Sequence, residues 1–229
     1  QRLSELNYWV ICYDQFGRGY SDRPKIKYSM DVYQLQLDEL LDHLKIDKFI
    51  LYGVSMGAPI AVQYSNNHID RSLAVGIQVP VVHIDNNIFK ILNVPIIGEM
   101  MMRFFGLPLI KKRAIEWNKD ESINEEFIEK YINQLSLPGT EHALLSASRN
   151  LFPKNYTYIY EAFSKTKIPI HIAYADDDTE VSPDSVRAII KINNDADVFM
   201  FTGGHGGSAK IPDKIVNMLE SFLSKNLNQ

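Results

Sequence analysis

Residues 49–62 have the sequence Phe49-Ile50-Leu51-Tyr52-Gly53-Val54-Ser55-Met56-Gly57-Ala58-Pro59-Ile60-Ala61-Val62. The apolar run at 49–52 is too short for a helix and predicts a buried strand, and the small residues after Gly57 predict the start of a helix. A serine at the apex of such a strand–turn–helix element projects its hydroxyl clear of the sheet. We expect Gly53 and Gly57 to be required, because a side chain at either position would strike the serine or the neighbouring strands.

The composition limits the functions that need to be considered. The chain has 229 residues and a formal net charge of -4 with both signs mixed, so no basic field favours a nucleic-acid partner. The one cysteine, Cys12, excludes an intrachain disulfide framework and a Cys-rich zinc site, and we expect it to be buried in an apolar run. The sequence has no stretch of membrane-span length and no signal peptide at residue 1, so we expect a cytoplasmic protein.

Strand and helix patterns alternate on both sides of the serine turn. This alternation predicts the α/β class, with a mostly parallel sheet and helices on both faces. We expect Ser29 and Ser182 to cap helices, with Pro183 in the first helical position of the second one. The expected strands are 8–13, 49–52, 72–79, 168–174 and 196–201, and the expected helices include 29–44, 59–66 and 213–227.

The alternation stops between residues 80 and 164. Helical patterns near 91–110, 124–134 and 141–150 predict short helices, and we interpret 80–164 as a helical cap, or lid, inserted into a core formed by 1–79 and 165–229. Four side chains of this segment are candidates for the lining of an acyl or aromatic pocket: Met100, Met101, Phe104 and Phe105. Packing of the cap onto the core is the alternative, and contact of the cap with a membrane surface stays open.

Three polar groups follow predicted strand ends. They are Ser55, the aspartates at 176–178 and His205, and the carboxyl ends of parallel strands share one edge of a sheet. An imidazole can take the proton of a serine hydroxyl, and a carboxylate can fix the imidazole tautomer. We therefore predict that Ser55 is a nucleophile, His205 its base and an aspartate the group that orients His205. The backbone N–H of Met56 is the expected oxyanion donor.

Other polar residues have structural interpretations. Asp14, Arg18 and Ser21 are expected to fix the glycine-rich loop at 14–24 by hydrogen bonds, because the acid of this arrangement should follow the serine in the chain. Four histidines are expected at the surface and His171 in the core, and none stands at metal-ligand spacing with carboxylates, so we expect neither a metal nor a cofactor. The four surface histidines are His43, His68, His83 and His142.

Taken together, these segments resemble the α/β-hydrolase superfamily, within the group of capped esterases, lipases and carbon–carbon-bond hydrolases. The resemblance covers most of the chain and is carried by residues 13–24, the serine turn, the aspartate loop and Gly204-His205. It implies a serine hydrolase that cleaves a carboxylic ester or similar acyl bond of a small, partly apolar molecule. In that family the acid usually lies three residues after a small residue that ends the strand. Ala175 occupies that place, which favours Asp178 over Asp176 and Asp177.

The chain also departs from the family pattern. Ala58 stands where relatives usually have glycine, and Lys210 stands where a glutamate usually follows the histidine. The chain begins just before the strand expected at 8–13, so we expect it to lack earlier strands and a His-Gly loop that supplies a second oxyanion donor. Loss of one such donor costs roughly a hundred- to thousandfold in rate. The alternative function is therefore a ligand-binding or low-turnover hydrolase-like protein, or an inactive fragment.

The residue at the turn separates other chemistries of the superfamily. Relatives resembling haloalkane dehalogenases and epoxide hydrolases place an aspartate there, and Ser55 argues against both. Hydrolysis of thioesters, amides or carbon–carbon bonds stays open, as does peracid formation.

Overall fold

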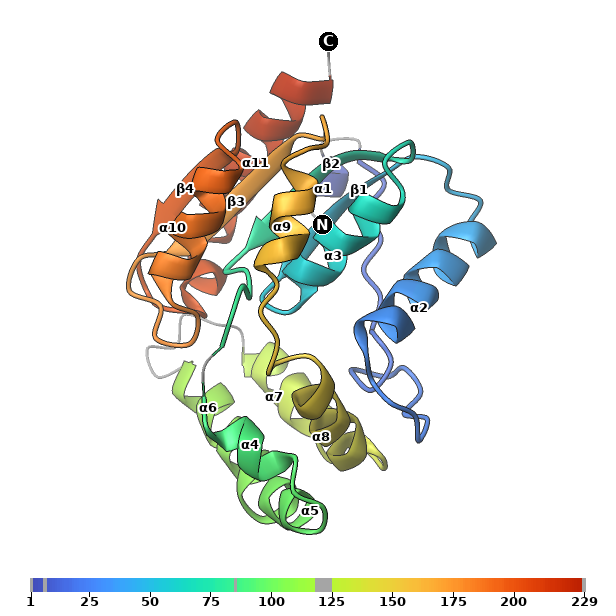
Figure 1. Ribbon diagram of the computed structural model, residues 1–229, viewed down its shortest axis with the longest axis vertical. Helices are drawn as coiled ribbons and strands as arrows, with labels where there is room; N and C mark the ends of the chain where they lie inside the picture. The colour runs from blue at the N-terminus through green and yellow to red at the C-terminus, as the bar shows by residue number, and fades with distance from the viewer. Residues whose placement is uncertain (1, 6–7, 85, 118–124, 228–229) are drawn as a thin grey trace. The chain divides into compact units, whose positions relative to one another are not determined.

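The computed structural model describes residues 2–5, 8–84, 86–117 and 125–227 (Figure 1). The chain divides into two compact units. The first comprises Gln1–Ile11, Asp38–Ile84 and Asn155–Gln229, and the second comprises Cys12–Leu37 and Asp85–Lys154.

The first unit contains a four-stranded parallel sheet in the order β1-β2-β3-β4. Val54 at the end of β1 pairs with Gln78 at the end of β2, and Ala175 at the end of β3 pairs with Phe201 at the end of β4. The carboxyl ends of the strands therefore lie along one edge of the sheet. The strand bounds are β1 (Phe49–Val54), β2 (Ser72–Gln78), β3 (Ile170–Ala175) and β4 (Asp197–Phe201).

Helices cover both faces of this sheet. On one face lie α3 (Gly57–Asn67), α9 (Thr157–Phe163) and α10 (Pro183–Ile192), and on the other lies α11 (Pro212–Leu227) (Figure 1). Apolar side chains of α11 pack on β2, where Leu219, Phe222 and Leu223 form a buried cluster with Ala74. These layers confirm the predicted parallel sheet with helices on both faces. The other elements with residues in this unit are α1 (Arg2–Glu5), the end of α2 (Met30–His43) and the 3-10 turn η2 (Gly207–Lys210).

The second unit is helical beyond its initial loop. Its middle segment, predicted as helical over 91–110, is divided because Pro95 has no N–H to donate and Ile96 has a φ of 68°. A core of Leu92, Met102 and Leu145 joins the pieces. Asn124 lies outside the described residues. Besides the first part of α2, the described helices of this unit are α4 (Ile88–Leu92), α5 (Ile97–Met101), the π-helical η1 (Met102–Gly106), α6 (Leu107–Trp117), α7 (Glu125–Gln134) and α8 (Thr140–Asn150).

The predictions for residues 8–13 are wrong. These residues form no strand, the side chain of Trp9 is 74% exposed, and Cys12 is exposed rather than buried. A strand is stable only where a neighbouring strand takes up its N–H and C=O groups, and no segment within the described ranges pairs with this one.

Ser182 occupies the cap position of α10 and Pro183 its first turn, as predicted, but the Ser182 hydroxyl makes no capping hydrogen bond to the described part of the helix. Among the helices that the structure describes, none combines the length and apolar character needed to cross a membrane.

The division into a core and an 80–164 cap stays a prediction. The compact second unit comprises residues 85–154 and also residues 12–37.

Candidate active site

Ser55 lies between β1 and α3 in a strained backbone conformation. Its φ is 54°, in the left-handed region that costs an L-residue roughly 1–2 kcal/mol. The end of β2 and the segment after it hold Ser55 from both sides: Ser55 N–H donates to the carbonyl of Gln78 at 2.9 Å, and Val81 N–H donates to the carbonyl of Ser55 at 3.2 Å. The surrounding backbone therefore fixes the conformation that presents the serine hydroxyl.

The two glycines of the turn have different roles. A Cβ added to Gly53 would lie 2.3 Å from the carbonyl oxygen of Gly57 and 2.8 Å from Cα of Ala58, which confirms that Gly53 is required. Among the described residues, a Cβ added to Gly57 would meet no heavy atom within 4 Å beyond its chain neighbours and the backbone of its own helix. The prediction that Gly57 is sterically required is therefore wrong, because its Cα already faces open space.

The structure brings together Ser55, His205 and Asp178. His205 Nε2 lies 2.9 Å from Ser55 Oγ, and His205 Nδ1 lies 2.7 Å from Asp178 Oδ2. The side chains of His205 and Asp178 are only 12% and 4% exposed. An ionised carboxylate can only accept, so a carboxylate at this distance selects the tautomer with the proton on Nδ1, in which the lone pair of Nε2 is directed at the serine hydroxyl. This arrangement can remove a proton from Ser55.

The three consecutive aspartates contact different groups. Asp178 reaches His205, and its other oxygen accepts hydrogen bonds from the backbone N–H groups of Glu180 and Val181 at 2.8 and 3.1 Å. Asp177 accepts from the N–H groups of Gly204 and Gly203, and these bonds hold the pKa of Asp177 below its usual value. Oδ1 of Asp176 is buried and has no hydrogen-bond partner among the described residues.

A second carboxylate, which the sequence analysis did not single out, faces the same imidazole. Glu180 Oε2 lies 3.9 Å from His205 Nε2. The signal was present in the sequence, since Glu180 lies two residues after Asp178 in an acidic run. Its position places an anionic group beside the imidazole nitrogen that contacts Ser55.

The N–H of Met56 lies at the amino end of α3. Met56 is the residue before the helix and has helical dihedral angles of -64° and -22°. The backbone hydrogen bonds within the described ranges leave its N–H unused. Because the first N–H groups of a helix have no partner within the helix, this donor is available to an acceptor outside the helix, and its role as an oxyanion donor stays a prediction.

The structural interpretation of the glycine-rich loop is confirmed. The carboxylate of Asp14 accepts from Tyr20 N–H at 2.9 Å, and its carbonyl accepts from the hydroxyl of Ser21. A guanidinium nitrogen of Arg18 donates to the carbonyl of Gly17 at 3.3 Å. A Cβ on Gly19 would lie about 2 Å from the Asp14 carboxylate, so the loop closes tightly around this side chain.

The pocket candidates lie in the second unit. Met100, Phe104 and Phe105 are each more than half exposed, whereas Met101 packs against the cluster that includes Met102. Their assignment to a substrate pocket stays a prediction.

His171 is buried in β3, as predicted, and also has a partner that the prediction missed. Its Nδ1 lies 2.6 Å from Asp197 Oδ2. Among the other histidines, His43, His83 and His142 are exposed, and His68 is half-buried and stacked on Tyr64 with ring centroids 4.0 Å apart. In the part of the chain that the structure describes, no three His, Cys, Asp or Glu side chains gather as metal ligands would.

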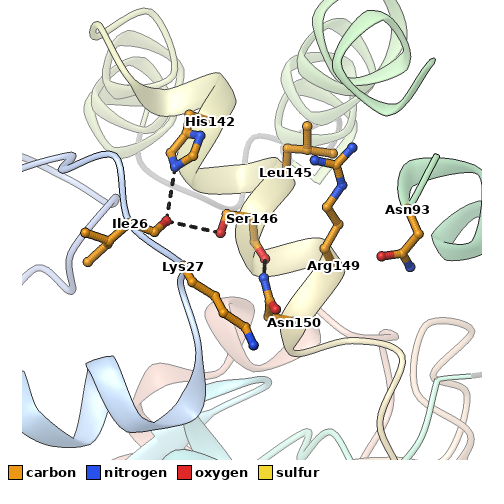
Figure 2. Close-up of a pocket in the computed structure, with 8 residues that line it drawn as sticks. All are labelled: Ile26, Lys27, Asn93, His142, Leu145, Ser146, Arg149 and Asn150. Atoms are coloured by element: carbon orange, nitrogen blue, oxygen red, sulfur yellow. Dashed lines mark hydrogen bonds between the residues drawn. The ribbon is translucent and has the colours of Figure 1, made fainter. Parts of the chain in front are cut away.

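The second unit has a pocket of its own, of about 400 Å³, between the loop at Ile26 and one face of α8 (Figure 2). His142 Nε2 and Ser146 Oγ both contact the carbonyl of Ile26, at 3.1 and 3.3 Å. Arg149 donates to the carbonyl of Leu92 and pairs with the carboxylate of Glu99. These polar groups are engaged in holding the unit together, and the pocket contains none of the predicted site residues.

Comparison with known proteins identifies the family of this chain. A family model described as alpha/beta hydrolase fold matches residues 1–208. An uncharacterised protein of Mycobacterium tuberculosis is 31% identical over 107 residues, which is 44% of this chain and 30% of that protein, so the match spans less than a third of the relative's length. A 3-oxoadipate enol-lactonase of Acinetobacter baylyi is 44% identical over 50 residues, covering 22% of this chain and 19% of that protein.

Solved structures extend the likeness in fold to nearly the whole chain. The crystal structure of a bromoperoxidase from Bacillus anthracis superposes with a TM-score of 0.76 at 17% sequence identity, and the match covers 93% of this chain and 80% of the bromoperoxidase. Since the family model accounts for residues 1–208 and the sheet carries the expected serine turn, this chain belongs to the alpha/beta hydrolase fold family.

Proposed function

We propose that this protein is a serine hydrolase that cleaves a carboxylic ester or a related acyl bond of a small, partly apolar substrate. One observation carries the proposal: His205 lies within hydrogen-bond distance of Ser55 through one ring nitrogen and of Asp178 through the other. A hydroxyl, an imidazole and a carboxylate in this order form the arrangement that activates serine as a nucleophile.

In the proposed mechanism, Ser55 Oγ attacks the acyl carbon while His205 Nε2 takes the hydroxyl proton. The carbonyl oxygen becomes an anion, and the N–H of Met56 donates to it. The carbon–oxygen bond to the leaving alcohol then breaks, and His205 returns the proton to that alcohol. Water repeats the sequence on the acyl-serine: His205 removes one proton from it, the acid is released, and Ser55 regains its hydrogen.

Asp178 has two roles in this scheme. Its Oδ2 keeps His205 in the tautomer with the proton on Nδ1, and its negative charge stabilises the imidazolium that forms when Ser55 loses its proton. The two backbone N–H bonds to Oδ1 hold the carboxylate in place while this happens. The catalytic orientation therefore depends on the turn at 178–181 as well as on the aspartate itself.

The substrate class is proposed from two kinds of support. Family membership favours hydrolysis, and the matched relative from Acinetobacter baylyi is named for a lactone, which is a cyclic ester. We further propose that the helical segment 80–164 acts as a lid and that Met100, Met101, Phe104 and Phe105 contact the apolar part of the substrate. If so, F104A should change the preference for acyl-chain length among p-nitrophenyl esters; an unchanged preference would remove Phe104 from the pocket.

A fluorophosphonate probe tests the nucleophile, because it phosphonylates only an activated serine. The wild-type protein should be labelled in a stoichiometric, time-dependent reaction, and S55A should not be labelled. S185A is a matched control, because Ser185 also bears a hydroxyl in the same unit but only donates to the carbonyl of Ser182. A folded protein whose labelling is absent, or is unchanged in S55A, would contradict the proposal.

A further inference from the structure

Gln78, the last residue of β2, contacts the chain on both sides of the Ser55–His205 pair. Its carbonyl accepts the N–H of Ser55 at 2.9 Å. Its side-chain amide donates from Nε2 to the hydroxyl of Ser208 at 2.6 Å, three residues after His205. Oε1 of the same amide accepts from the hydroxyl of Tyr52 at 2.8 Å. All of these residues belong to the first unit.

The loop that carries His205 needs such an attachment. It follows β4, which is an edge strand, and Gly203 and Gly204 have φ values of 112° and 68°. Glycine can adopt many backbone conformations, so contacts outside the loop are needed to hold it in one of them. The amide of Gln78 ties the turn after His205 to β2, which lies two strands away from β4 in the sheet order.

The environment of Gln78 fixes the direction of its amide. The side chain is 7% exposed, so both ends of the amide need partners. Burial raises the pKa of the Tyr52 phenol, which keeps this hydroxyl protonated and able to donate to Oε1. The ring of Tyr52 lies over Gly76, where a Cβ would come within 2.5 Å of a ring carbon. With Tyr52 holding Oε1, the Nε2 end is left to face Ser208.

The backbone next to Gln78 is also fixed. Val79 has a φ of 40°, which is rare for a β-branched residue, and it is 1% exposed. Its N–H donates to the carbonyl of Ala173 in β3 at 2.8 Å. The end of β2 is therefore a rigid point from which a side chain can position a loop.

We propose that Gln78 is a positioning residue that holds the His205 loop at hydrogen-bond distance from Ser55 through its amide contact with Ser208. The inference rests on the proposed function, since it concerns the geometry of the same pair. Gln78 contacts no reacting atom through its side chain, and it acts through the turn Gly207–Lys210. Loss of the link should let His205 move away from Ser55, and a displacement of about 1 Å can cost up to a hundredfold in rate.

The test compares S208A, S208T and Q78M with a matched control, S72A. Ser72 lies at the opposite end of β2, and its hydroxyl donates to that of Ser65 at 2.9 Å in a buried contact. S72A removes this contact, so it should lower stability without affecting the contact between Ser55 and His205. With p-nitrophenyl acetate, and with rates expressed per active site titrated by the fluorophosphonate, S208A should lower kcat about tenfold and leave KM within about twofold. S208T, which keeps the hydroxyl, should retain kcat within about twofold, as should S72A.

A double variant tests the link itself. If Gln78 acts through Ser208, adding S208A to Q78M should lower kcat by less than about twofold, because the contact is already lost. Multiplicative effects of the two substitutions, a wild-type kcat in S208A, or an equal loss in S72A would each overturn the inference.

A readout that needs no turnover separates this inference from the proposed function. The proton on His205 Nδ1 should give a downfield NMR signal that is sharp in the wild type and S72A and broadened in S208A. If the wild type hydrolyses no ester, the proposed function fails, while this signal still shows whether Gln78 and Ser208 hold the imidazole. A signal unchanged in S208A would contradict the positioning role.

Discussion

His205 Nε2 lies 2.9 Å from Ser55 Oγ, although the two residues are 150 positions apart in the chain. The sheet register brings them together, because β1 and β4 end at the same edge. Ser55 is held there by the end of β2, and His205 by Asp178 and by the turn at Ser208. The proposed chemistry depends on this juxtaposition.

Substitution of the orienting acid should separate two neighbouring aspartates. D178N replaces the acceptor that fixes the tautomer of His205, and we expect kcat to fall about 10³-fold or more. D177N keeps an oxygen that can accept from Gly203 and Gly204, and kcat should stay within about tenfold of wild type. Steady-state kinetics on p-nitrophenyl acetate measures both kcat values. A larger loss of kcat in D177N than in D178N would show that Asp178 is not the orienting acid.

The two glycines of the serine turn should respond differently to alanine. G53A forces a Cβ against the backbone of Gly57 and Ala58, and we expect the free energy of unfolding to fall by about 1–3 kcal/mol. G57A adds a Cβ in open space at the start of α3, and stability should change by less than about 1 kcal/mol. Urea unfolding followed by circular dichroism gives both values. Equal losses in the two variants would refute this account of the turn.

The left-handed conformation of Ser55 predicts that glycine at this position gives a more stable protein than alanine. S55G and S55A both remove the nucleophile, but glycine also relieves the strain of the positive φ, so S55G should be about 1 kcal/mol more stable than S55A. At Ser164, where φ is -61°, the order should reverse and S164G should be less stable than S164A. Thermal unfolding of the four variants provides the comparison, and S55G below S55A would contradict the strain.

Burial of His171 predicts a pH dependence of stability. Desolvation lowers the pKa of His171 from its ordinary value of 6.5, against the opposing effect of Asp197. The unfolded chain therefore binds a proton at this position more readily than the folded one, and the free energy of unfolding should fall as the pH drops below about 6.5. The slope from this one group cannot exceed about 1.4 kcal/mol per pH unit.

Two variants isolate this contribution. H171Q should flatten the dependence of the urea-unfolding free energy between pH 7 and pH 5, whereas H43Q, at an exposed position, should leave the slope as it is. A slope that stays the same in H171Q would mean that His171 binds its proton equally well in the folded and unfolded chain, and a steeper slope would mean that the folded chain binds it more tightly.

Local sequence patterns predicted much of this fold. The short apolar run before Ser55 and the polar residues after two later strands placed Ser55, the aspartates at 176–178 and His205 at one edge, because parallel strands leave few other arrangements. The strand predicted at 8–13 failed because an apolar run forms a strand only when a second segment supplies hydrogen bonds. The requirement at Gly57 failed because the direction of its Cα cannot be read from the G-x-S-x-G spacing.

The contacts of Gln78 could not have been found in the same way. Tyr52 and Ser208 lie 26 and 130 positions from Gln78, and each is an ordinary residue for its element. A glutamine at the end of an otherwise apolar strand was the one available signal, since a buried amide needs partners. The pairing of His171 with Asp197 was hidden for the same reason, because it depends on the register of β3 and β4.

In the proposed reaction, Ser55 carries the acyl group during turnover. Wild-type protein mixed with p-nitrophenyl butyrate, quenched in acid within the first turnover and digested, should yield the peptide containing Ser55 with the added mass of one butyryl group. The adduct should be absent from S55A and should persist longer when H205A is acylated slowly. Hydrolysis by the wild type with no acyl group on Ser55, or with the group on another residue, would contradict the account.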